Sequence, residues 1–228
     1  MNLRRAAIAE FFGTAFLLMV VVGSGIMGES LAGGNIAIAL LANSLATGAG
    51  LFVLIRSFGP LSGAHFNPVV TLTEVIWKRI KPKQMAIYWA AQFSGAIVGV
   101  IAAHAMFGQV LLQISTKVRF GTHLWISEAI ATFGLLGTIM LSGKKNPDAV
   151  PVSVGLYVMA AYWFTSSTSF ANPAVTVARM LTNSFCGIRP EGVAPFIVAQ
   201  CVGTALAILL LDGLEKPRTE GERGPNRV

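Results

Sequence analysis

Charged residues are scarce in this chain, and their scarcity excludes a soluble protein. Of its 228 residues, 12% are charged and 54% are hydrophobic. Soluble domains carry about 25% charged residues, so this sequence lacks the polar groups that a water-facing surface requires. The net charge of +7 does not indicate a nucleic-acid partner, because no soluble domain exists to present a basic face.

Cysteine is also scarce, and catalytic patterns are missing. Cys186 and Cys201 are the only cysteines. Because one falls in a loop and the other in an apolar segment, we expect no disulfide framework. The sequence contains no nucleophile–base pair, no metal-ligand spacing and no phosphate-binding loop. We therefore expect a protein that is not an enzyme and that needs neither a cofactor nor a metal.

Long apolar segments, in contrast, are abundant. A helix crosses a bilayer with about 20 apolar residues, and segments of that length predict six membrane spans. Their expected bounds are 6–27, 35–56, 84–107, 123–142, 149–168 and 192–211. The predicted fold class is therefore an all-α membrane protein. The tail over residues 212–228 mixes charged residues with Gly and Pro, which favours a disordered segment.

Lys and Arg residues gather on one side of the predicted spans. With six spans both termini share a side, and four of the 17 Lys and Arg residues fall on the opposite one. Those four are Lys117, Arg119, Arg179 and Arg189. Because cytoplasmic loops are enriched in Lys and Arg, we expect cytoplasmic termini and a multi-pass protein of the inner (plasma) membrane.

Two Asn-Pro dipeptides occupy corresponding places in the two halves of the chain, at Asn67 and Asn172. Asn is a good helix N-cap, and Pro fits the first helical position because its missing N–H would be unbonded there. The segments that follow, to about residues 77 and 181, are too short to cross a bilayer. We expect two re-entrant half-helices that are buried in protein or line a cavity. They start at Pro68 and Val69 and at Pro173 and Ala174.

The two halves, about 6–107 and 123–211, share further features in the same order. Each half has a Glu in its first span, an Asn-Pro dipeptide, and an Ala-Gln-x-x-Gly sequence in its last span. The residues are Glu10, Asn67 and Gln92 in the first half and Glu128, Asn172 and Gln200 in the second. An odd number of spans in each half inserts the second copy upside down. The half-helices then enter from opposite faces, and the two asparagines meet near the middle.

Glu10 and Glu128 place charged groups inside predicted spans, where an ionisable residue is functional or paired. We expect each carboxylate to accept hydrogen bonds from backbone N–H groups of the loop that leads to a half-helix. The alternative role is proton coupling, as in a transporter. Gln92 and Gln200 suit the same bracing task, or form interhelical hydrogen bonds without functional consequence. His65 is expected to fix the first loop, and the alternative is contact with the solute.

These residues resemble the aquaporin and aquaglyceroporin (major intrinsic protein) family. The resemblance rests on Ser-Gly-Ala-His-x-Asn-Pro over residues 62–68 and Asn-Pro-Ala over residues 172–174, and it extends from Glu10 to Gly203. It implies an aquaporin-like channel domain over residues 1–211, a homotetramer in the lipid bilayer, and passive transport of water or small uncharged solutes without a cofactor. Asn67 and Asn172 would be donors at the pore centre. With the positive ends of the half-helices they would form a barrier to cations and protons.

The sequence departs from the family pattern at both Asn-Pro motifs. Val69 stands where Ala is usual, which adds apolar bulk near the pore centre. Val175 stands where the family has the Arg of the outer constriction, and Arg179, one helical turn further on, cannot occupy the same position. The resemblance carries the other constriction positions to Thr47, to Ser169 and to either Val158 or Ala160. All of these are small and uncharged, so we expect a wide constriction and not a water-only channel.

The sequence therefore predicts a broad facilitator of small neutral solutes, namely glycerol, urea, water and undissociated metalloid acids such as arsenous acid. The Val-for-Arg pattern resembles bacterial channels linked to arsenic resistance, which extends the prediction to methylated arsenicals. A channel that still passes only ordinary polyols is the alternative. A secondary active transporter with the same inverted-repeat layout is a rival class, and a pore that leaks protons or cations is another.

Overall fold

The structure, a computed structural model, describes residues 2–144 and 146–215. Over these ranges it is built from helices and contains no strand, so the predicted all-α class is confirmed. The long helices are α1 (Leu3–Leu31), α2 (Ile36–Ser62), α4 (Pro82–Met106), α5 (Thr122–Gly143), α6 (Val150–Phe164) and α8 (Pro190–Glu215). The short ones are α3 (Pro68–Ile76), the 3-10 turn η1 (Pro147–Ala149) and α7 (Pro173–Arg179).

Among the described residues, five helices are long and apolar enough to cross a membrane: α1, α2, α4, α5 and α8. The fifth predicted span, 149–168, is shorter than expected. Helix α6 has 15 residues and ends at Phe164, because Thr165 is extended and leads the chain into a re-entrant loop. Helix α8 continues past the predicted end at residue 211. Of the tail predicted to be disordered, residues 216–228 lie outside the described part.

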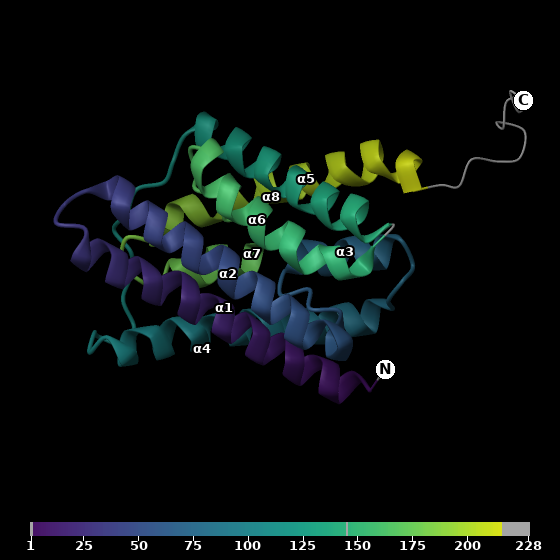
Figure 1. Ribbon diagram of the computed structural model, residues 1–228, viewed down its shortest axis with the longest axis horizontal. Helices are drawn as coiled ribbons and strands as arrows, with labels where there is room; N and C mark the ends of the chain where they lie inside the picture. The colour runs from purple at the N-terminus through teal and green to yellow at the C-terminus, as the bar shows by residue number, and fades with distance from the viewer. Residues whose placement is uncertain (1, 145, 216–228) are drawn as a thin grey trace, which may run out of the picture.

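The two halves pack in the same way. Helix α1 packs against α2 and α4, and α5 packs against α6 and α8, so the bundle has two similar sets of helices (Figure 1). Glycines allow the close crossings. A Cβ at Gly95 would lie 2.3 Å from the Phe11 carbonyl oxygen, and one at Gly203 would lie 2.2 Å from the Ala129 carbonyl oxygen. Neither crossing leaves room for a side chain.

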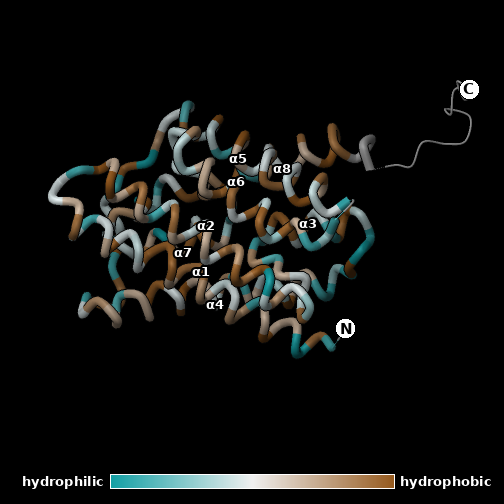
Figure 2. The backbone as a smooth tube through the Cα atoms, viewed as in Figure 1, coloured by the Kyte–Doolittle hydropathy of each residue, from teal (hydrophilic) through white to brown (hydrophobic). Residues whose placement is uncertain are grey.

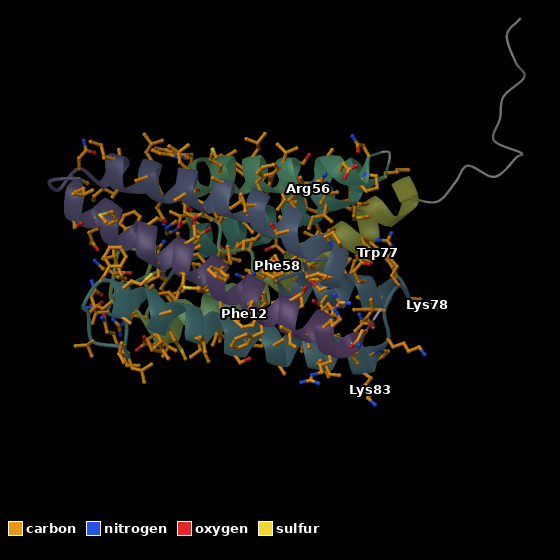
Figure 3. The ribbon with its side chains drawn as sticks, turned by 60° about the horizontal axis from the view of Figure 1, so that its bottom comes forward. Phe12, Arg56, Phe58, Trp77, Lys78 and Lys83 are labelled. Atoms are coloured by element: carbon orange, nitrogen blue, oxygen red, sulfur yellow. The ribbon has the colours of Figure 1, made fainter. Side chains whose placement is uncertain are left out.

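The start of α1 and the end of α8 lie at one end of the bundle, on the right in Figure 1, which we call the terminus side. Lys78 and Lys83 project there (Figure 3). Hydrophilic residues lie mainly toward the ends of the bundle, and the stretch between them is largely hydrophobic (Figure 2). Large apolar side chains such as Phe12 and Val198 are exposed on its outside, as expected of a surface that contacts lipid. The multi-pass architecture predicted from the sequence agrees with this arrangement.

Candidate functional site

The two half-helices meet through their capping asparagines. Each Asn Oδ1 accepts a hydrogen bond from the backbone N–H two residues on, at 3.1 Å for Asn67 and 3.0 Å for Asn172. Asn67 Nδ2 donates to the Ala171 carbonyl and Asn172 Nδ2 donates to the Phe66 carbonyl, both at 2.8 Å. An amide nitrogen carries two N–H donors. Both asparagines line one cavity, so each has a second donor available for a solute.

The Glu10 carboxylate contacts the loop that leads to α3. It accepts hydrogen bonds from Ser62 Oγ (2.7 Å), His65 N (2.9 Å) and Phe66 N (2.7 Å). Gln92 Nε2 donates to the same carboxylate at 2.8 Å. Glu10 is completely buried, and a buried charge is tolerated when hydrogen bonds compensate it. This geometry is the one expected for a residue that braces the loop.

The Glu128 carboxylate makes the corresponding contacts in the second half. It accepts hydrogen bonds from Phe170 N (2.8 Å) and Ala171 N (2.9 Å). Gln200 Nε2 donates to it at 2.7 Å and to Thr176 Oγ1 at 2.8 Å. Glu128 is also completely buried. The structure thus brings each predicted Glu and Gln to the loop of its own half.

The two loops run through backbone conformations that side chains rarely adopt. Ala64 and Phe66 have φ of 50° and 49°, and Ser169 and Ala171 have φ of 50° and 45°. Such left-handed residues are strained, and they persist only where their surroundings hold them. Each strained segment is held by the carboxylate and by the asparagine cap described above.

His65 contacts both its own loop and the cavity. Its Nδ1 lies 3.0 Å from Thr71 Oγ1, and the residue is also part of the cavity lining. The two roles that the sequence left open are therefore compatible with a single position. At the half-helix starts, Val69 and Ala174 are buried but do not line the cavity. The apolar bulk that Val69 adds near the pore centre thus lies behind the cavity lining and not in it.

A cavity of about 280 Å³ surrounds the two asparagines. Of the predicted outer constriction, Thr47, Val158, Ser169 and Val175 all line it. Ala160 does not, because it is exposed on the outside of α6. Two residues apart on a helix differ in direction by about 200°, so Val158 and Ala160 cannot both face the cavity. Of the two alternatives that the sequence left open, Val158 is the one at the cavity.

Charged and aromatic side chains line the same cavity. Tyr162 OH lies 3.2 Å from Thr47 Oγ1. Arg179 is 2% exposed, and its guanidinium carbon lies 3.4 Å from the centre of the Phe170 ring. Tyr162, Phe170 and Arg179 all belong to the lining. The cavity wall therefore contains charged and aromatic side chains in addition to the small residues assigned from the sequence.

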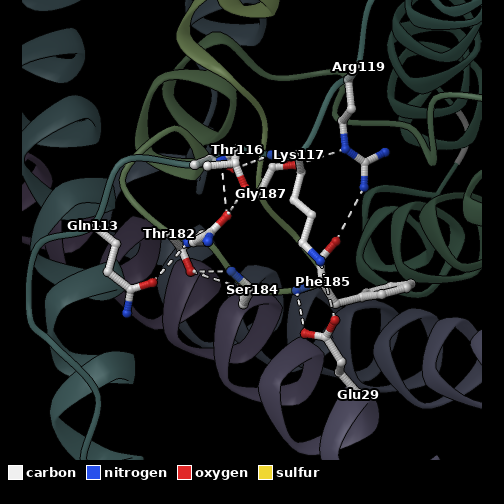
Figure 4. A network of polar contacts seen from close by, with 11 residues as sticks. Glu29, Gln113, Thr116, Lys117, Arg119, Thr182, Ser184, Phe185 and Gly187 are labelled. Carbon is white, nitrogen blue, oxygen red and sulfur yellow. Dashed lines mark hydrogen bonds and ion pairs between the residues drawn. The ribbon is translucent and has the colours of Figure 1, made fainter. Parts of the chain in front are cut away.

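Arg119 connects two loops, one of which holds Gly187 (Figure 4). From the segment between α4 and α5 it donates Nε to the Gly187 carbonyl (2.9 Å) and Nη1 to the Ser167 carbonyl (3.1 Å). Its guanidinium carbon lies 5.2 Å from the Phe170 ring centre. Burial, followed by repulsion from Arg179, lowers the pKa of Arg119 to about 10, so it stays protonated at neutral pH.

Two inverted sets of helices, each with a half-helix that begins at a shared cavity, define a membrane channel. The chain belongs to the Major intrinsic protein family, which matches residues 1–169 and 143–227. It is 49% identical to the Aquaglyceroporin AqpS of Rhizobium meliloti (strain 1021) over 95% of this chain and 92% of that protein. It is 32% identical to the Aquaporin NIP2-1 of Oryza sativa subsp. japonica over 82% of this chain and 64% of that one.

A solved structure, that of the aquaglyceroporin from Plasmodium falciparum, shares the fold. The TM-score is 0.74 at 21% identity, over 92% of this chain and 96% of the other. The family assignment also agrees with a channel and not an enzyme, as expected from the sequence. The recognition of the family from its two Asn-Pro motifs is confirmed.

Proposed function

We propose that this protein is a passive channel for small uncharged solutes with a wide outer constriction, which passes glycerol, urea, water and neutral metalloid acids, including arsenous acid and methylated arsenicals. The observation that carries the proposal is Val175, which lines the cavity where the family pattern has Arg. Thr47, Val158 and Ser169 are further small residues of this wall. The name of the 49% identical relative, an aquaglyceroporin, supports solutes of the size of glycerol.

The two asparagines supply the polar contacts at the centre of this path. Their second N–H donors stabilise a hydroxyl or water oxygen that has lost its partners in bulk water. The rest of the wall is largely apolar, with residues such as Leu51, Ile55 and Val154. An ion would lose its hydration there without compensation. Passive flux of neutral solutes is therefore favoured over the rival class, secondary active transport.

The test is stopped-flow light scattering on proteoliposomes, comparing the native chain with Val175→Arg. Glycerol and methylarsenic permeability should fall at least about tenfold in the variant, equal to 1.4 kcal/mol of added barrier, while water permeability falls less. Val175→Met adds length without charge, and Val53→Met makes the same change at an exposed site on α2. Equal permeabilities for the native chain and Val175→Arg would contradict the proposal. Accumulation beyond equilibrium that a protonophore abolishes would favour the transporter.

We also propose a homotetramer in the plasma membrane with both termini cytoplasmic. Arg56, Lys78 and Lys83 lie at the terminus side of the bundle (Figure 3), which supports this orientation under the positive-inside rule. The mass of the detergent-solubilised protein by light scattering, corrected for detergent, tests the oligomer. Labelling of a cysteine introduced at Lys83 in intact cells tests the orientation.

A further inference from the structure

The register of the half-helices places Arg179 in the pore wall. Residues four apart on a helix share a face, and in α7 both Val175 and Arg179 line the cavity. In α3 the positions equivalent by the repeat, Val70 and Glu74, line it as well. Both half-helices therefore present the same two positions to the solute path.

The Arg179 side chain is fixed in a defined place. Helical side chains lean toward the N-terminus of their helix, so this one leans from the end of α7 toward the pore centre. Its guanidinium carbon lies 3.4 Å from the centre of the Phe170 ring, two residues before Asn172 in the loop. Its Nε donates to the Cys186 carbonyl. Arg179 belongs to the cavity lining, so we expect the N–H donors of its two Nη groups to face the cavity.

A second observation points to a ligand at this level. Ser169 Oγ is buried and has no hydrogen-bond partner within the described part of the chain, although Ser169 lines the cavity. A buried hydroxyl without a partner costs about 1–3 kcal/mol, and water or a solute hydroxyl in the cavity removes that cost. Ser169, Arg179 and the Tyr162–Thr47 hydroxyl pair together offer donors and acceptors suited to a polyol.

We propose that Arg179 takes over, from one helical turn further along α7, the role of the cation that position 175 lacks. This inference rests on the proposed function, because it names the residue that sets selectivity in the same channel. The guanidinium repels protons and cations at the outer end of the cavity and donates hydrogen bonds to the neutral solute. Because the guanidinium is held against Phe170 and position 175 carries only the small side chain of Val175, the path at that position stays wide. The channel thus combines a broad solute range with exclusion of cations.

Arg119 supports this arrangement from the other loop. It contacts the same Phe170 ring at 5.2 Å and donates hydrogen bonds to the Gly187 and Ser167 carbonyls. The ring therefore has a guanidinium against it from each of two separate segments. This fixes Phe170, and Phe170 in turn fixes the position of Arg179.

The test compares Arg179→Met with the native chain in proteoliposomes. Proton flux is followed with an enclosed pH dye under a potassium–valinomycin potential, and glycerol flux by light scattering. We expect proton flux to rise at least about tenfold, or 1.4 kcal/mol of lost barrier, while glycerol flux persists. Arg179→Lys should keep proton exclusion. The double variant Val175→Arg with Arg179→Met should restore proton exclusion and reduce glycerol flux, because the positive charge then lies at position 175 and the longer side chain narrows the path there.

The control is Arg189→Met, an exposed arginine of the same side paired with Glu191, which should leave both fluxes unchanged. Proton flux at the native level in a folded Arg179→Met protein would overturn the inference. If that variant is not recovered in the membrane, Arg179→Gln is judged by the same two fluxes. Failure of the native chain to pass glycerol would instead overturn the proposed function, and the proton measurement would still decide the role of Arg179.

Discussion

The two re-entrant loops, residues 62–67 and 167–172, follow the same backbone path with different side chains. Gly63 has φ of 88° in the first loop, and its counterpart Thr168 has φ of 62°. A β-branched residue rarely adopts this conformation. The path is therefore fixed by the buried carboxylate and by the asparagine cap, which both loops share, and not by glycine. The second loop carries more strain and requires more support.

That support comes from different residues in the two halves. In the first loop, Tyr88 OH donates to the Ser62 carbonyl at 2.8 Å. In the second, Arg119 Nη1 donates to the equivalent Ser167 carbonyl at 3.1 Å. A neutral phenol holds one loop and a guanidinium holds the other. Both halves therefore keep a hydrogen bond to the equivalent Ser carbonyl, but its donor is neutral in the first half and charged in the second.

The half-helices differ in charge as well. Glu74 of α3 and Arg179 of α7 occupy equivalent positions in the cavity wall. Glu74 makes a 3.0 Å ion pair with Arg79, whereas Arg179 lies on an aromatic ring. The pore thus has an acidic group toward the terminus side and a basic group toward the other side. The permeation barrier to cations is expected at the basic end.

The largest effect is expected from changes at the buried carboxylates that both halves share, Glu10 and Glu128. Replacing Glu10 or Glu128 by Gln removes the charge and turns an amide toward backbone N–H donors. Each change should lower stability by about 3 kcal/mol, since hydrogen bonds to buried charges are strong. The apparent melting temperature in detergent measures the loss.

Glu10→Gln should be the more damaging of the two, because Glu10 accepts an additional bond from Ser62 Oγ. Glu191→Gln, at an exposed ion pair, is the matched control and should melt with the native protein. A native melting temperature for both buried variants would show that the carboxylates do not hold the loops.

A smaller effect is expected from changes at Arg119 and Tyr88, the residues that support the two loops. Arg119→Met removes three kinds of contact, to carbonyls, to Thr168 Oγ1 at 3.4 Å and to the Phe170 ring. We expect glycerol permeability to change several-fold, because Phe170 and Arg179 lose a fixed position. Tyr88→Phe removes one hydrogen bond worth about 1 kcal/mol and should lower stability while leaving flux unchanged. If both variants affect flux equally, the second loop is not more dependent on its support than the first.

The sequence predicts those features of the fold that follow from its apolar segments and its internal repeat. Six helical segments, two short half-helices and the convergence of Asn67 and Asn172 all follow from apolar length and from inverted symmetry. The choice between Val158 and Ala160 did not follow, because it depends on loop length, which a single sequence does not fix. The rotation of α6 about its own axis in the folded protein decides which of the two side chains faces the cavity.

The place of Arg179 in the cavity wall did not follow for a different reason. Its spacing from position 175 shows only that it lies one helical turn further on, whereas the aligned halves match Val70 with Val175 and Glu74 with Arg179. The contacts of Arg119 could not be predicted in the same way. They join segments without periodicity, and a loop-to-loop contact of this kind leaves no local pattern in the sequence.

The smallest effect is expected at Glu74, and it tests whether the two ends of the pore are functionally unequal. Its carboxylate is paired with a partly exposed Arg79, and such pairs contribute about 0–1 kcal/mol. A carboxylate attracts cations, so Glu74→Gln removes no barrier, and proton and glycerol fluxes should stay within about twofold of native, or 0.4 kcal/mol. Arg179→Met, measured in the same vesicles, provides the contrast. A proton leak in Glu74→Gln as large as that in Arg179→Met would place the barrier at both ends, and the charge asymmetry of the half-helices would then have no bearing on selectivity.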